Sequence, residues 1–157
     1  IMVAIIMQVM YKKLDLTMIL NGALGGLVAV TAGPDLYDIY TPILIGSVGG
    51  IIVVIGVSFF DKLKIDDPVG ALSVHLLNGI WGTVAVGLFA SNGDDITLLG
   101  QLKGIIVVAI FAFVSSYIIL YIINKIMPLR AGNDEEMQGL DVEECGIEAY
   151  PEFKRAF

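Results

Sequence analysis

The chain has 157 residues, of which 57% are hydrophobic and 16% are charged. A soluble domain would be about half apolar and about a quarter charged, so this composition is typical of a membrane protein. The formal net charge of -7 lies mostly in the C-terminal segment, which has eight acidic and three basic residues from Arg130 onward. The sequence has no basic patch for nucleic acid, and its single cysteine, Cys145, excludes an internal disulfide.

Apolar runs separated by short polar segments follow one another as far as Met127. An α-helix needs about 20 residues to cross a hydrocarbon core of roughly 30 Å, and most of the runs approach this length. The first run has no initiating Met and no charged segment before it, which indicates a fragment that begins inside a membrane helix. We therefore predict an all-α, polytopic membrane protein with spans at residues 1–11, 14–33, 42–60, 68–91 and 104–123.

Local signals mark the starts of two of these spans. Asp15 is a candidate N-terminal cap of the second span. Pro68 suits the first turn of the fourth span, because its missing N–H is not needed there. Asp66 and Asp67 then lie where the positive end of the helix dipole favours carboxylates.

Basic residues mark one side of the membrane. If the five spans alternate in direction, Lys103 alone falls on one side. The other eight bases share the opposite side: Lys12, Lys13, Lys62, Lys64, Lys125, Arg130, Lys154 and Arg155. Such a bias identifies the cytoplasmic side. We therefore predict a transmembrane region at residues 1–128 and a cytoplasmic tail at residues 129–157.

The only histidine, His75, lies within the fourth span. It stands about seven residues, or roughly 10 Å, beyond Pro68. A titratable ring inside a membrane is costly, so it is a candidate functional residue, although a histidine bonded to a neighbouring helix would fit the same pattern. Helical spacing predicts that it shares a face, either a channel wall or a packed interface, with Ala71 or Leu72, Asn78 or Gly79, and Gly82.

Small residues recur four positions apart in several spans, as Gly22 and Gly26, Gly46 and Gly50, and Thr83 and Gly87. Such pairs let helix backbones approach closely in a membrane. Each pair alone therefore indicates tight packing and does not identify a pore.

Soluble chemistries are poorly supported. The sequence lacks a Walker-type phosphate loop and a cluster of Cys and His with metal-ligand spacing. His75 and Cys145 are too far apart along the predicted topology to act as nucleophile and base. We therefore expect neither an enzyme nor a bound metal or other cofactor.

Three blocks of the sequence resemble the C-terminal half of ammonium transporters of the Amt and Rh superfamily. They are Leu20–Gly33, the stretch from Asp66-Asp67-Pro68 through His75 to Trp81-Gly82, and Gly139-Leu140-Asp141 with Glu148–Phe153. The blocks follow the order of the family over nearly the whole chain. The resemblance implies the last five helices of an eleven-helix, inverted-repeat transporter, followed by a regulatory cytoplasmic tail.

The resemblance also implies a homotrimer in the cell membrane whose protomers each conduct ammonium or ammonia through a narrow apolar pore. His75 matches the second of a pair of pore histidines, with Ala71 and Leu72 beside it, and its partner belongs to the missing half. The positions implied to be structural or regulatory on the cytoplasmic side are Asp66, Asp67, Pro68, Gly139, Asp141, Tyr150 and Pro151. The tail is then an expected contact for a cytosolic regulator of the PII type.

Two other functions remain open from the residues themselves. The chain could belong to a proton-coupled carrier of another substrate that uses His75 in a proton relay. It could also be a structural or regulatory membrane piece in which His75 only packs.

Overall fold

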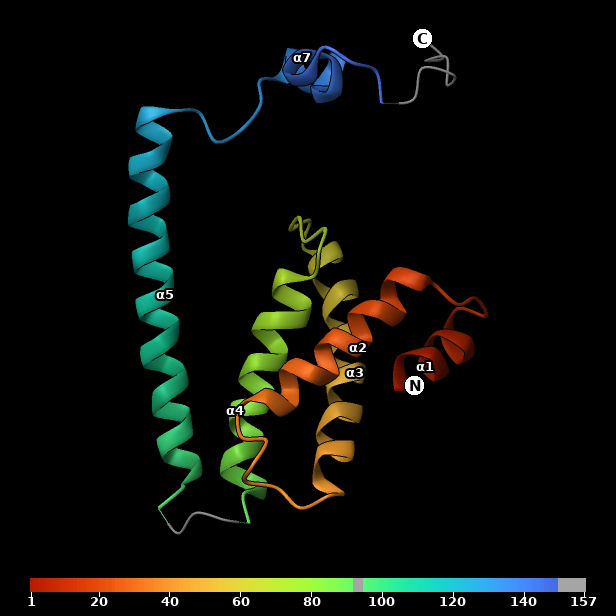
Figure 1. The fold of residues 1–157 in the computed structure, drawn as a ribbon, viewed down its shortest axis with the longest axis vertical. Coiled ribbons are helices and arrows are strands. Elements are labelled where there is room, and N and C mark those ends of the chain that lie inside the picture. Colours follow the sequence, from red (N-terminus) through yellow and green to blue (C-terminus); the bar gives the residue numbers. More distant parts are fainter. Residues whose placement is uncertain (92–94, 150–157) are drawn as a thin grey trace. The chain divides into compact units, whose positions relative to one another are not determined.

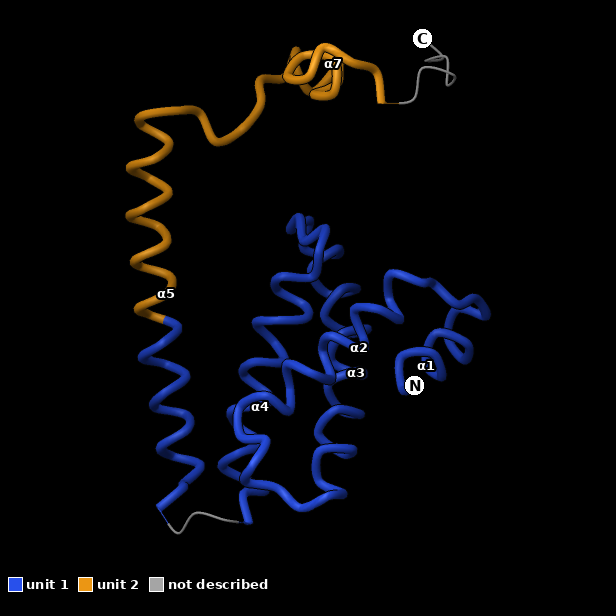
Figure 2. The backbone as a smooth tube through the Cα atoms, in the orientation of Figure 1, with its two compact units in different colours: residues 1–109 blue, residues 110–157 orange. Residues whose placement is uncertain are grey.

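The computed structural model describes residues 1–91 and 95–149, and the regular elements in these ranges are all helices. The chain divides into two compact units, residues 1–109 and residues 110–157 (Figure 2). The prediction of an all-α protein is confirmed for the described residues. The helices, shown in Figure 1, are α1 (Met2–Met10), α2 (Leu16–Thr31), α3 (Thr41–Lys62), η1 (Ala71–Leu76), α4 (Leu77–Phe89), α5 (Leu98–Ile126), α6 (Asn133–Gln138) and α7 (Leu140–Cys145).

Among the described residues, three helical segments are long and apolar enough to cross a membrane. They are α3 with 22 residues, η1 and α4 together with 19, and α5 with 29. The apolar helix α2 has 16 residues, fewer than the about 20 that a perpendicular crossing requires. Each predicted span contains a helix, but α5 begins before the predicted position 104 because Thr97 Oγ1 accepts a hydrogen bond from Gly100 N at 3.1 Å and caps an earlier turn.

Aspartate side chains accept hydrogen bonds from backbone amides at the starts of α2 and α3. Asp15 Oδ1 accepts a hydrogen bond from Met18 N at 2.8 Å, so the predicted cap of α2 is confirmed. Asp38 Oδ1 accepts from Tyr40 N at 2.9 Å and from Thr41 N at 2.7 Å at the start of α3. Both helices therefore begin at positions fixed by side chains.

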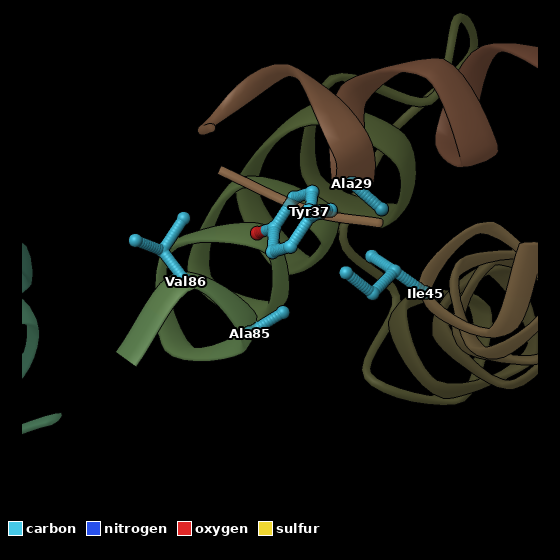
Figure 3. Packing of buried hydrophobic residues seen from close by; sticks show 5 residues of the cluster. All are labelled: Ala29, Tyr37, Ile45, Ala85 and Val86. Carbon is cyan, nitrogen blue, oxygen red and sulfur yellow. The ribbon is translucent and has the colours of Figure 1, made fainter. Parts of the chain in front are cut away.

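The core of the first unit forms where α2, α3 and α4 meet. A Cβ added at Gly26 would lie 3.6 Å from the Gly46 carbonyl oxygen, so the two backbones are in direct contact at this crossing. This confirms close packing at two of the predicted glycines. Figure 3 shows the Tyr37 ring among the other side chains of the buried cluster, which consists of Ala29, Tyr37, Ile45, Ala85 and Val86.

One polar bond joins α3 to α4 across this core. Trp81 Nε1 donates to the Ile45 carbonyl oxygen at 3.1 Å. The indole is the only donor of the tryptophan side chain, so its polar requirement is met inside the bundle. The bond helps to fix the rotation of α4 against α3.

The helix in the fourth span begins later than predicted. Helical geometry starts at Ala71, after Gly70, whose φ is +76°. Pro68 lies in the preceding turn, in which Gly70 N donates to the Asp67 carbonyl oxygen at 3.2 Å. The prediction that Pro68 occupies the first helical turn is wrong, because a left-handed residue, which glycine adopts at little cost, separates it from the helix.

Candidate functional site

The helix that carries His75 begins as a π-helix. His75 N donates to the Gly70 carbonyl oxygen at 3.4 Å, and Leu77 N donates to the carbonyl of Leu72. Each of these bonds spans five residues, whereas an α-helical bond spans four. Single π-turns within α-helices are rare and occur frequently at functional sites. The geometry of η1 therefore marks this end of the span independently of its histidine.

Asp67 closes the N-terminus of η1 from the preceding loop. Its Oδ1 accepts from Leu72 N at 3.0 Å, and its Oδ2 accepts from Ser73 N at 3.0 Å and from Ser73 Oγ at 2.9 Å. Burial alone would raise the pKa of Asp67, but hydrogen bonds from Ser73, Leu72 and Ala71 outweigh it and lower the pKa. The predicted position of this carboxylate at the helix start is confirmed, while Asp66 is exposed beside it.

This cap makes the stability of the protein depend on pH. The folded pKa of Asp67 lies below its unfolded value of about 4, so the stabilisation is complete above that pH and is lost as the pH falls through the folded pKa. Asp67→Asn keeps one acceptor oxygen but loses the charge and the second acceptor, so we expect it to cost about 1 kcal/mol at pH 7 and to flatten the loss of stability below pH about 4. Thermal unfolding in detergent from pH 7 to pH 3 measures both effects.

Asp66→Asn is the matched control, since Asp66 neighbours the cap without taking part in it. Its unfolding temperature is expected to follow that of the parent at every pH. Equal effects of the two substitutions would show that the cap of Asp67 contributes nothing.

The structure separates residues that were predicted to share a face with His75. Asn78 and Gly82 are buried against α2 and α3, whereas His75 is exposed. A Cβ added at Gly79 would meet no atom within 4 Å, so Gly79 and not Asn78 lies on the open side. Of the two predicted alternatives Gly79 therefore fits the face of His75, whereas Asn78 and Gly82 turn toward the core and do not share it.

Ala71 and Leu72, the two residues predicted to lie beside His75 in the pore, differ in exposure. Ala71 is exposed and Leu72 is half-buried. Ser73 and Val74, by contrast, are both 0% exposed and face the core. The accessible side of this helix in the described chain is therefore formed by Ala71, His75 and Leu76, with Leu72 at its edge.

Asn78 is a polar residue whose complete burial among three helices was not predicted from the sequence. It is 0% exposed, its Nδ2 donates to the Ser73 carbonyl oxygen at 3.4 Å, and its Oδ1 has no partner within the described residues. A Cβ at Gly25 would lie 3.0 Å from this Nδ2, and one at Gly49 would lie 2.9 Å from this Oδ1. The signal that could have found it is an amide within an apolar span, since such groups normally face other helices.

Comparison with known proteins identifies the family. Residues 1–150 match the model of the Ammonium Transporter Family. The chain belongs to the ammonium transporter family. Its apolar helices and this membership together make it a membrane protein, as the composition predicted.

Individual ammonium transporters are similar over most of this chain. A putative ammonium transporter of Synechocystis is 42% identical over 135 residues, which cover 86% of this chain and 30% of that protein. The ammonium transporter Amt2 of Archaeoglobus fulgidus is 34% identical, with 90% of this chain and 34% of that protein covered. A solved structure named a sensor Amt protein matches with a TM-score of 0.80 at 30% identity and covers 91% of this chain and 38% of that one. The chain therefore spans about a third of the length of these proteins.

The tail of this family member contains a short helical hairpin in the second unit. Gly139, with φ of +100°, lies between α6 and α7, and Gly146 ends α7 in the left-handed region. Asp141 Oδ2 accepts from Ala149 N at 2.9 Å and ties the following segment back to α7. Two predicted tail residues, Tyr150 and Pro151, lie outside the described residues.

Proposed function

We propose that this chain forms part of a pore that conducts ammonium or ammonia across the cell membrane, with His75 lining that pore. The observation that carries the proposal is the exposure of His75 on a largely apolar helix whose neighbouring residues, Ser73 and Val74, are buried. Within a member of the ammonium transporter family, an intramembrane ring turned away from its own core supports a role in transport.

The chemistry of the residues supports this proposal. An ion in hydrocarbon costs several kcal/mol or more, whereas neutral ammonia does not bear this cost. A neutral imidazole has one acceptor and one donor nitrogen, so it can receive a proton on one side and release one from the other. In the proposed pore, ammonia crosses the apolar section lined by Ala71 and Leu72, and His75 forms one half of a histidine pair that relays the proton.

The assembly and location are part of the same proposal. The protein is a homotrimer of the cell membrane, its transmembrane region ends at residue 128, and residues 129–157 form a cytoplasmic tail. Eight of the nine basic residues fall on the same side of the membrane as the tail, which supports this orientation. The tail positions Gly139, Asp141, Tyr150 and Pro151 would serve contact with a cytosolic PII-type regulator, in keeping with the similarity to a sensor Amt protein. Asp66 and Pro68 would belong to the cytoplasmic side of the transmembrane region.

The test is His75→Ala in the intact transporter, reconstituted into vesicles. Because the proposed ring both lines the pore and relays the proton, the ratio of electrical current to methylammonium uptake is expected to change. Uptake and current are measured on the same preparation, and size-exclusion chromatography checks assembly. A variant that assembles normally and keeps the parent's ratio and its discrimination against potassium would overturn the proposal.

A further inference from the structure

We propose that Asn78 is a positioning residue that holds the π-turn of η1 and through it the orientation of His75. The inference rests on the proposed role of His75 in transport. Asn78 does not lie on the accessible side of the helix, since it is 0% exposed within the core. It acts on the ring through the backbone that joins the two residues.

The π-turn leaves one backbone carbonyl without its usual partner. In an α-helix Leu77 N would donate to the carbonyl of Ser73, but here it donates to the carbonyl of Leu72. Asn78 Nδ2 donates to the Ser73 carbonyl oxygen instead, at 3.4 Å. Ser73 and Asn78 are both fully buried, so the side-chain amide provides the bond that a buried carbonyl requires.

Glycines of two neighbouring helices leave the space that the amide fills. Gly25 of α2 faces its nitrogen and Gly49 of α3 faces its oxygen, each so closely that an added Cβ would need the neighbour to move. An apolar side chain in this slot would not bury an amide oxygen that has no partner among the described residues. The presence of the amide at this cost indicates a polar role for it.

The π-turn is thus fixed at both ends, with His75 between them. Asp67 binds the amides of Leu72 and Ser73 from the N-terminal side, and Asn78 binds the Ser73 carbonyl from the C-terminal side. A π-turn contains one residue more than an α-helical turn. If the segment became α-helical, the residues before the turn would therefore rotate relative to those after it by about 100°, the rotation of one α-helical residue. His75 would then turn relative to α4, while the cap at Asp67 would have to shift.

The experiment uses Asn78→Leu and Asn78→Asp in the intact transporter. Asn78→Asp keeps the size and shape of the side chain, whereas Asn78→Leu replaces the amide with a larger apolar group, and both remove the donor to Ser73. We expect the segment from Ala71 to Leu76 to lose its π-turn in a cryo-EM structure, with Leu77 N bonded to Ser73. We also expect methylammonium uptake to fall about 10- to 100-fold, since misplacement of a functional group by about 1 Å has effects of this size.

Ser47→Ala is the matched control. It removes the bond of 2.6 Å from Ser47 Oγ to the Ile43 carbonyl, which is likewise a side-chain bond to a helix backbone in the first unit. Its uptake and structure are expected to equal those of the parent.

Each other outcome is decisive. A retained π-turn with His75 unmoved overturns the proposal, and so does a straightened helix with parental uptake. Failure of both variants to assemble, while Ser47→Ala assembles, would assign Asn78 to folding alone and also overturn it. Parental transport by His75→Ala would instead reject the role of His75, and the effect of Asn78 on the π-turn would still be read from the structures.

Discussion

Replacing Gly82 with Ala is expected to lower the stability of the first unit by about 3 kcal/mol, because overpacking against a backbone cannot be relieved by side-chain movement. A Cβ at Gly82 would overlap the Ala29 carbonyl oxygen and lie 3.0 Å from the Ala29 carbonyl carbon. These atoms belong to the backbone of α2, so the two helices would have to separate. The apparent melting temperature in detergent, followed by size-exclusion chromatography, measures the loss.

Gly46→Ala provides the matched comparison within the same bundle. Its Cβ would lie 3.8 Å from Gly26 Cα, which is an ordinary van der Waals distance. We expect this variant to unfold within a few degrees of the parent. If Gly82→Ala were as stable as Gly46→Ala, the close approach of α4 to α2 would be refuted.

The second large effect is an all-or-none difference in thiol labelling. Cys145 is exposed and is the only cysteine of the chain. Because the proposed orientation puts the tail in the cytoplasm, a charged maleimide should modify Cys145 in inverted vesicles and leave it unmodified in intact cells. Labelling is detected by a mass shift of the purified protein.

Asp95→Cys in a Cys145→Ser background tests the opposite side. Asp95 is exposed in the connection between α4 and α5, so this thiol should react in intact cells only. Reaction of Cys145 from outside intact cells would reverse the proposed orientation. Cys145→Ser alone controls for other thiols of the intact transporter.

The sequence was informative where structure depends on local pattern. The apolar runs predicted the helices, Asp15 predicted the start of α2, and the glycine spacing predicted close packing that is realised between Gly26 and Gly46. The helices and the cap depend on residues within a turn or two of one another. The glycine pairs allow close packing against any neighbouring helix. They could therefore be inferred without knowing which helices meet.

The start of the fourth span could not be inferred in this way. Gly70 lies inside the predicted span 68–91, but it adopts a φ of +76° and delays the helix to Ala71. In the π-turn that follows, backbone hydrogen bonds span five residues instead of four. A segment of six residues is too short for this change to show in the hydrophobic periodicity. The predicted face of His75 assumed uniform α-helical spacing, which held for Ala71 and Gly79 but not for Gly82.

The burial of Asn78 depends on residues that are distant in the sequence. Gly25 and Gly49 provide its slot, and they belong to two different helices. Spacing within one span cannot report such a contact. The roles of His75, Ala71 and Leu72 in transport are likewise predictions that the transport experiments must test.

The glycine crossing of α2 and α3 has a consequence for the order of folding. The two helices are joined by a short connection between Thr31 and Thr41, so the entropy lost in bringing them together is small. Both are synthesised before the helix that carries His75, and chains fold from the N-terminus during synthesis. The α2–α3 hairpin can therefore form first as a template, and Asn78 and Gly82 dock onto a surface that already contains Gly25, Ala29 and Gly49.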